Sequence, residues 1–172
     1  MKNSLKKFNT LVQKLEALPS VGKKSAIRIA YHISFIDKFE GLNLAHCIEE
    51  SIKDIQKCSN CNGISENEIC EICLDEYRGK DTICIVESPK DILVIEQSDT
   101  YNGKYFVLED ISEKSLNQLL DLSENTKEII FAFPPSINSE SLIIYVQNKL
   151  EHLDIEFYKI AHGVPTGVKL EN

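Results

Sequence analysis

The sequence predicts an α+β chain with several domains: an amino-terminal helical module, a small cysteine-rich segment and an α/β domain with a mostly parallel, Rossmann-like sheet. Three observations support this prediction. Apolar residues recur at helical spacing up to about residue 57, two closely spaced cysteine pairs follow, and apolar strands then alternate with helices. The boundaries predicted by these changes of pattern are 1–57, 58–80 and 81–172.

The helical module is expected to contain three helices. Apolar side chains three and four residues apart predict the first over 4–17, with Ser4 as its N-cap and Pro19 ending it. Two more are expected over 24–35 and 42–55. The second helix is expected to bury Ile29, Ala30 and Ile33. The third is expected to present an apolar face formed by Ala45, Ile48, Ile52 and Ile55.

The rest of the chain beyond residue 80 is predicted to be an α/β domain. Strands are expected over 82–87, 104–108, 128–133 and 156–161, and helices over 91–97, 115–122 and 140–153. The strands are almost continuously apolar, which is typical of a parallel sheet covered by helices on both faces.

Four cysteines lie at the junction of the two larger parts. The predicted metal ligands are Cys58, Cys61, Cys70 and Cys73. Each CxxC turn can direct two thiolates at one ion, and four thiolates complete a tetrahedral zinc site. Because four protein ligands leave no position for water, we expect one structural Zn²⁺ per chain, with a redox pair or an iron site as the alternatives. The other two cysteines, Cys47 and Cys84, lie in apolar contexts and are expected to be buried, inert thiols.

The charge of the chain is unevenly distributed. The formal net charge is −8, yet residues 1–28 carry seven basic side chains and a single acidic one, Glu16. Residues 58–172 carry nine basic and twenty-one acidic side chains, a balance of −12. This asymmetry favours a polyanionic partner at the amino-terminal end, although a solvated lysine-rich surface would give the same pattern.

The stretch LPSVGKKSAIRIA, residues 18–30, lies between the first two predicted helices. Gly22 permits a backbone conformation that a side chain would hinder, and the helix that follows begins with free N–H groups. Such an N-terminus binds phosphate oxygens, and contacts of this kind do not read base sequence. The residues expected to bind DNA are Gly22, Lys23, Lys24, Ser25 and Arg28. Alternatively, this is an ordinary turn between helices with solvated lysines.

The stretch resembles a helix-hairpin-helix, and the order of parts resembles the RecR family of bacterial recombination mediators. The matching segments are LPSVGKKSAIRIA, CSNCNGISENEICEIC, ICIVESPKDILVIEQ, KYFVL and IAHGVP. Ser20 and Lys23 stand where the family usually has glycine and proline, the connection after KYFVL is short, and the sequence ends at Asn172, as in a member with a shortened carboxyl terminus.

The resemblance implies a helix-hairpin-helix module, a four-cysteine zinc finger and a Toprim domain. It further implies DNA contacts by Lys24 and Arg28, and an action with RecO, and in some members RecF, that loads RecA onto gapped DNA. Dimers or tetramers and a cytoplasmic, nucleoid-associated location in bacteria are expected on the same ground.

The Toprim resemblance raises the question of catalysis. Catalytic Toprim domains hold Mg²⁺ with a glutamate after the first strand and an Asp-x-Asp after the third. Glu87 stands in the glutamate position, but Pro134 and Ser136 replace the two aspartates, and only Glu140 remains of the acidic cluster. We therefore expect no enzyme, and expect Glu87 and Glu140 to lie on an acidic face that docks a partner, with a solvated acidic rim as the alternative.

Other classes of function find less support. The sequence contains no P-loop for an ATPase, no apolar stretch long enough to span a membrane and no apolar segment of a signal peptide. The alternatives to a DNA-binding mediator are a Mg²⁺-dependent, Toprim-type nuclease or primase-like enzyme, and a protein-interaction scaffold whose hairpin packs on another subunit.

Overall fold

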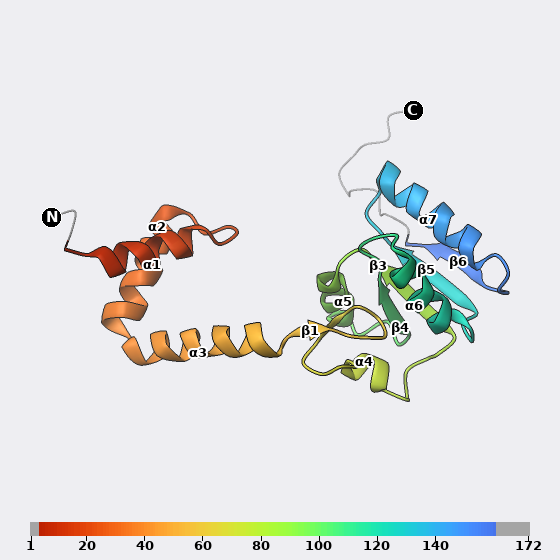
Figure 1. The fold of residues 1–172 in the computed structure, drawn as a ribbon, viewed down its shortest axis with the longest axis horizontal. Coiled ribbons are helices and arrows are strands. Elements are labelled where there is room, and N and C mark those ends of the chain that lie inside the picture. The colour runs from red at the N-terminus through yellow and green to blue at the C-terminus, as the bar shows by residue number, and fades with distance from the viewer. Residues whose placement is uncertain (1–3, 161–172) are drawn as a thin grey trace, which may run out of the picture. The chain divides into compact units, whose positions relative to one another are not determined.

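The computed structural model describes residues 4–160, and the chain divides into two compact units, Met1–Asp54 and Ile55–Asn172. The first unit is helical, and the second joins a small cysteine-rich finger to an α/β sheet (Figure 1). This architecture confirms the predicted fold class. Residues 161–165, which supply most of the IAHGVP motif, lie outside the described residues. No helix within 4–160 is long and apolar enough to cross a membrane.

Two helices, α1 (Lys6–Glu16) and α2 (Lys23–Tyr31), pack together around a very small core. Its buried side chains are Val12, Ala26 and Ala30. Because the two alanines are four residues apart on one face of α2 and have short side chains, α1 can approach the α2 backbone closely.

Two details of this pair differ from the predictions. Ile29 was expected to be buried but is 36% exposed, because α2 turns the stripe that holds Ala26 and Ala30 towards α1 and Ile29 lies beside it. Ser4 was expected to cap α1, but the helix begins at Lys6 with Leu5 in the cap position and no side-chain hydrogen bond there.

The third helix, α3 (Lys38–Asp54), follows α2 after a π-helical turn, His32–Ile36 (η1). It passes η1 at Gly41, where a Cβ would lie 2.4 Å from the carbonyl oxygen of Ile33. Ile33 is accordingly only partly buried, and no residue of α3 is buried. The apolar face predicted for α3 therefore exists, but it is not covered within the described chain.

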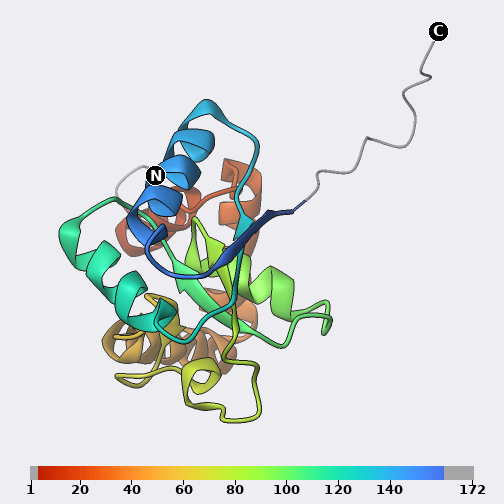
Figure 2. The same cartoon turned by 90° about the vertical axis from the view of Figure 1, so that its right-hand side faces the viewer.

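The second unit contains a parallel sheet with the strand order β4-β3-β5-β6. Its strands are β3 (Thr82–Val86), β4 (Lys104–Val107), β5 (Glu128–Ala132) and β6 (Glu156–Lys159), and its helices are α5 (Pro89–Glu96), α6 (Glu113–Ser123) and α7 (Ile137–Leu150). Figure 2 shows α6 and α7 on one side of the sheet and α5 on the other. The predicted order of strands and helices is confirmed.

Alternate residues of β3, β4 and β5 enter two separate cores. On one face Ile85 and Phe131 pack with residues of α6 and α7, including Leu119. On the other, Val86 and Tyr105 pack with Ile92 of α5. Since both faces of β3 and β4 are buried, and β5 is buried on one face and partly buried on the other, these strands are largely apolar, which is the pattern seen in the sequence.

Candidate functional site

The four predicted ligands converge in the finger. The finger consists of a short hairpin, β1 (Gln56–Lys57) and β2 (Ile64–Ser65), and the single helical turn α4 (Glu71–Leu74). The sulfur atoms of Cys58, Cys61, Cys70 and Cys73 all lie within 4.8 Å of one another. Cys58 Sγ is 3.9 Å from Cys73 Sγ, and Cys61 Sγ is 3.6 Å from Cys70 Sγ. A zinc tetrahedron with Zn–S distances of about 2.3 Å has S–S edges of about 3.8 Å, so the cluster has the right size for zinc.

Backbone and thiol hydrogen bonds connect the four cysteines of this cluster. The backbone N–H of Gly63 donates to Cys61 Sγ at 3.4 Å, and that of Cys70 donates to Cys58 Sγ at 3.3 Å. Hydrogen bonds from Cys61 and Cys73 lower the pKa of the Cys70 thiol, and the same Cys70 bond raises the pKa of Cys61. Since zinc binds thiolates and releases their protons, all four sulfurs would be deprotonated in the loaded site.

The remaining two cysteines differ from each other. Cys84 on β3 is buried, as predicted, and burial raises the pKa of its thiol to about 12. Cys47 is exposed on α3, so the prediction of a buried thiol there was wrong. Its apolar neighbours in the sequence belong to the face of α3 that no described residue covers.

The turn between α1 and α2 is held by its own backbone. The N–H of Val21 donates to the carbonyl of Leu18 at 3.2 Å, and Ser20 has a φ of 64°. With Pro19 in the second position, these are the features of a type II turn. Gly22 has a φ of −81°, which any residue adopts, and a Cβ there would have nothing within 4 Å. The expectation that Gly22 supplies a special conformation was therefore wrong, and Ser20 is the residue in the left-handed region.

All the predicted DNA-binding residues lie at the first turns of α2. Gly22 is the N-cap residue, and no side chain caps the helix. Lys23, Lys24, Ser25 and Arg28 are exposed. Among residues 4–160, no ion pair involves either lysine or the arginine. The free N–H groups, the helix dipole and these three cations therefore form a surface that attracts anions.

At the carboxyl ends of the strands, hydroxyl groups occupy the region where a catalytic Toprim domain would have carboxylates. Ser139 Oγ donates to Glu87 Oε1 at 2.9 Å. Ser136 caps α7 by accepting from the N–H of Ser139 at 3.0 Å. Within residues 4–160, the only converging group of three or more metal-ligating side chains is the cysteine cluster.

Glu87 and Glu140 line different hollows of the surface. Glu87 is half-buried beside Phe133, Pro134 and Ile160, in a cavity of about 460 Å³. Glu140 is exposed, pairs with Lys159 of β6 and lines a second cavity of about 430 Å³. The two carboxylates thus lie near the same end of α7 but line different cavities.

Comparisons with known proteins agree with this geometry. The family model described as "RecR, helix-hairpin-helix" matches residues 8–52, the model of the RecR four-cysteine zinc finger domain matches 55–75, and the "Toprim domain" matches 81–161. A protein of Campylobacter jejuni subsp. doylei named "Recombination protein RecR" is 49% identical over 100% of this chain and 92% of its own length. The chain belongs to the RecR family. Proteins with the same printed name from Nitratiruptor and Helicobacter pylori are 48% and 45% identical, over 100% and 99% of the chain and 92% and 90% of their own lengths.

Membership settles two of the open questions. The RecR family has a role in recombinational repair and is not catalytic, so the Toprim domain here is not a nuclease or a primase. The four-cysteine finger of the family and the convergence of the four side chains identify the metal as a structural zinc ion rather than iron.

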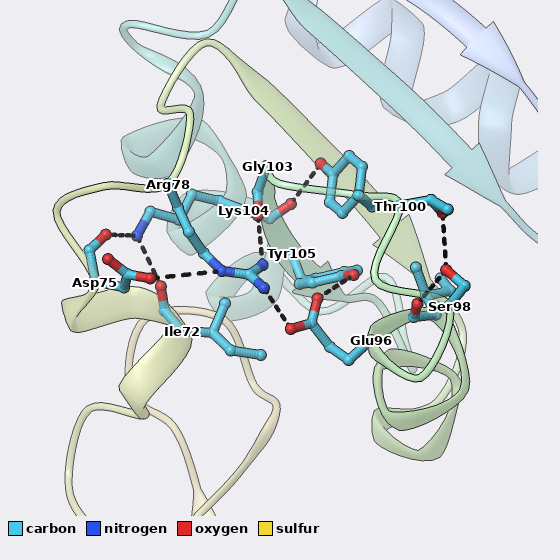
Figure 3. A network of polar contacts seen from close by, with 11 residues as sticks. Ile72, Asp75, Arg78, Glu96, Ser98, Thr100, Gly103, Lys104 and Tyr105 are labelled. Carbon is cyan, nitrogen blue, oxygen red and sulfur yellow. Dashed lines mark hydrogen bonds and ion pairs between the residues drawn. The ribbon is translucent and has the colours of Figure 1, made fainter.

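Sequence reasoning missed two cations beside the finger, of which Lys104 is buried and Arg78 partly buried. Lys104 is 7% exposed, and Arg78 reaches the carbonyl of Gly103 at 2.9 Å and the carboxylate of Glu96 (Figure 3). One signal was present in the sequence: Lys104 begins the otherwise apolar strand KYFV. A lysine whose neighbours all point into a core is a candidate for a buried, hydrogen-bonded ammonium group.

Proposed function

We propose that this RecR family member is a zinc-stabilised DNA-binding mediator that acts with RecO, and in some settings RecF, to load RecA onto gapped DNA. The observation that carries the proposal is the first turn of α2, with its uncapped N–H groups and its exposed Lys23, Lys24 and Arg28. Contacts of this kind bind the phosphates of DNA of any sequence, which suits a protein that acts wherever a gap occurs. In this proposal, residues 1–57 bind DNA, residues 58–80 form the zinc finger, and residues 81–172 dock the partner.

The DNA contact is tested by charge reversal. Fluorescence anisotropy on gapped duplex DNA compares wild type with the double variant Lys24→Glu/Arg28→Glu. A control with the same net charge, Lys114→Glu/Lys127→Glu, changes two exposed lysines of the second unit. We expect the hairpin variant to lose binding at least tenfold while the control stays within about threefold, because each phosphate contact contributes a large, local electrostatic gain. Equal loss in both variants would show that only net charge matters and would remove the hairpin from the proposal.

Partner docking is proposed for the Toprim surface around Glu87, with Glu140 at its edge. In α/β domains the carboxyl ends of the strands are where ligands bind, and Glu87 is held there by Ser139. We expect Glu87→Ala to weaken RecO binding in titration calorimetry without changing the zinc content. The control is Glu151→Ala, at an exposed glutamate outside this surface, which should leave RecO binding unchanged. If Glu87→Ala does not change the affinity for RecO, this assignment is wrong.

Self-association is proposed for the helical unit, as a dimer or a tetramer. The large apolar side chains that η1 and α3 leave exposed are Phe35, Ile36, Phe39, Leu42, Leu44, Ile48 and Ile52. Phe39 and Ile52 are 75% and 76% exposed, and an uncovered apolar surface of this kind marks a protein contact. Several chains together would also multiply the weak phosphate contacts of one hairpin.

Light scattering after gel filtration tests this assembly. Wild type is expected to have at least twice the mass of one chain, and Phe39→Glu/Ile52→Glu is expected to be monomeric and folded, since neither side chain is buried in the single chain. A monomeric wild type would contradict self-association, and an unchanged mass in the variant would move the contact to another surface.

A further inference from the structure

One strand of the sheet holds both halves of the zinc finger. β4 is an edge strand, and its free edge faces the finger. The N–H of Val107 donates to the carbonyl of Cys61 at 2.8 Å, and Asn62 Nδ2 donates to the carbonyl of Val107 at 3.3 Å. The first knuckle, Cys58–Cys61, is therefore attached to β4 through backbone groups that an edge strand would otherwise expose to solvent.

The second knuckle, Cys70–Cys73, is attached to the same strand by a side chain. Lys104 Nζ donates to the carbonyls of Ile72 and Asp75, each at 2.7 Å, and to the carbonyl of Cys73 at 3.3 Å. Figure 3 shows the ammonium group between Ile72 and Asp75. Because α4 is a single turn, its last carbonyls have no partner within the helix, and Lys104 takes the place of a C-terminal cap.

Lys104 differs from its neighbour Arg78 in its counter-charge. The Arg78 guanidinium pairs with Glu96, whose second oxygen accepts from Tyr105 Oη at 2.7 Å. For Lys104, no carboxylate partner occurs among residues 4–160, although the residue is only 7% exposed. A buried ammonium group is costly unless hydrogen bonds and an opposite charge compensate it.

A loaded zinc site would place an opposite charge beside Lys104. Four thiolates around Zn²⁺ have a formal charge of −2, and the ligand Cys73 lines the same cavity of about 220 Å³ as Lys104. Groups beyond the ligands commonly orient a metal site and balance its charge.

We propose that Lys104 is a positioning residue for the zinc site: it fixes the Cys70–Cys73 knuckle through three carbonyls and compensates the charge of the tetrathiolate centre. Zinc retention then depends on a residue of the Toprim sheet. In turn, the hydrogen bonds along the outer edge of β4 depend on a zinc-loaded finger. The inference rests on the zinc site alone and is independent of DNA binding.

The test measures zinc release from the folded, zinc-loaded full chain to the chelator 4-(2-pyridylazo)resorcinol. Lys104→Met keeps the length of the side chain and removes the charge and the donors. Leu119→Ala, in the core on the other face of the sheet, is the control for a general loss of stability. We expect Lys104→Met to release zinc at least tenfold faster than wild type, Leu119→Ala to stay within about twofold, and Lys104→Arg to restore part of the retention.

A spectroscopic readout separates positioning from stability. In the Co²⁺-substituted protein, the thiolate charge-transfer and d–d bands report the ligand geometry, and we expect them to shift in Lys104→Met and not in Leu119→Ala. If Lys104→Met releases zinc no faster than Leu119→Ala and has an unaltered Co²⁺ spectrum, the proposal is wrong. If Lys104→Met does not fold, amide hydrogen exchange of wild type is measured with and without zinc. Zinc removal must speed exchange at the Val107 amide, and an unchanged exchange rate there would overturn the proposed coupling between the finger and β4.

Discussion

At the third position of the turn between α1 and α2, Ser20 has a φ of 64°, in the region that favours glycine. A non-glycine residue in this conformation costs about 1–2 kcal/mol. Replacing it with glycine would remove that cost but would also make the unfolded chain more flexible, which offsets part of the gain. The turn that precedes the proposed DNA-binding residues therefore contains local backbone strain at one exposed residue, Ser20.

This strain predicts the effect of two substitutions. Ser20→Gly is expected to raise the free energy of unfolding by up to about 1 kcal/mol, and Ser20→Val to lower it by at least about 1 kcal/mol, because a β-branched residue tolerates positive φ poorly. Urea denaturation followed by circular dichroism measures both. A glycine variant less stable than the valine variant would contradict the observed backbone conformation.

The cysteines outside the finger are expected to differ strongly in reactivity. Cys47 is exposed, whereas burial raises the pKa of the Cys84 thiol to about 12. At pH 8 we expect iodoacetamide to modify Cys47 at least about a hundredfold faster than Cys84, since only thiolates react. Peptide mass spectrometry over time gives both rates, and comparable rates would contradict the burial of Cys84.

The pKa shift of Cys84 also has a consequence for stability. The thiol ionises near pH 9 in an unfolded chain and near pH 12 in the folded one. Above pH 9 the unfolded state therefore binds fewer protons than the folded state, and this thiol makes the fold less stable as the pH rises from 9 to 12.

Among the elements, the finger shows which parts of a site can be predicted from sequence. The ligands Cys58, Cys61, Cys70 and Cys73 were predictable because each pair is local and the CxxC spacing determines the turn. The apolar strand around Lys104 could indicate its burial but not its contact with the finger, since Lys104 lies 31 residues from Cys73 in the chain and meets it only through the packing of β4 against the finger. Contacts between distant segments leave no spacing for a motif to record.

Loss of a ligand tests the finger as an element. Cys61→Ser is expected to abolish the binding of one zinc per chain and to lower the melting temperature, because structural zinc contributes on the order of 10 kcal/mol of binding free energy to folding. Elemental analysis of the purified protein measures the metal content. One zinc per chain in the variant would show that Cys61 is not a ligand.

For α3, periodicity identified the helix but not its surroundings. Residues such as Ile48 and Ile52 recur at helical spacing, which normally indicates a buried face, and yet they are 51% and 76% exposed. An amphipathic pattern reports that a helix has an apolar face and does not say which chain covers it. The same ambiguity explains the wrong prediction for Cys47.

On the scale of the whole molecule, the fold follows from patterns that repeat along the chain. The strands of the sheet are predictable because both faces of β3 and β4 are buried, as Ile85 and Val86 of β3 show. The distribution of charge separates a basic amino-terminal module from an acidic remainder, and the structure gives the basic module exposed cations such as Lys24 and Arg28. What the charge pattern could not show was that these cations lie on the first turns of a helix whose N-terminus no side chain caps.

The measurement that tests this account most directly is the salt dependence of DNA binding. The dissociation constant for gapped duplex DNA is measured by anisotropy from about 50 to about 300 mM salt, for wild type and Lys24→Glu/Arg28→Glu. If α2 grips phosphates, the slope of log K against log salt should become shallower by about 2 in the variant, since each lost contact removes about 0.9. A slope that the substitutions leave unchanged would place the phosphate contacts elsewhere and contradict the proposed role of the hairpin.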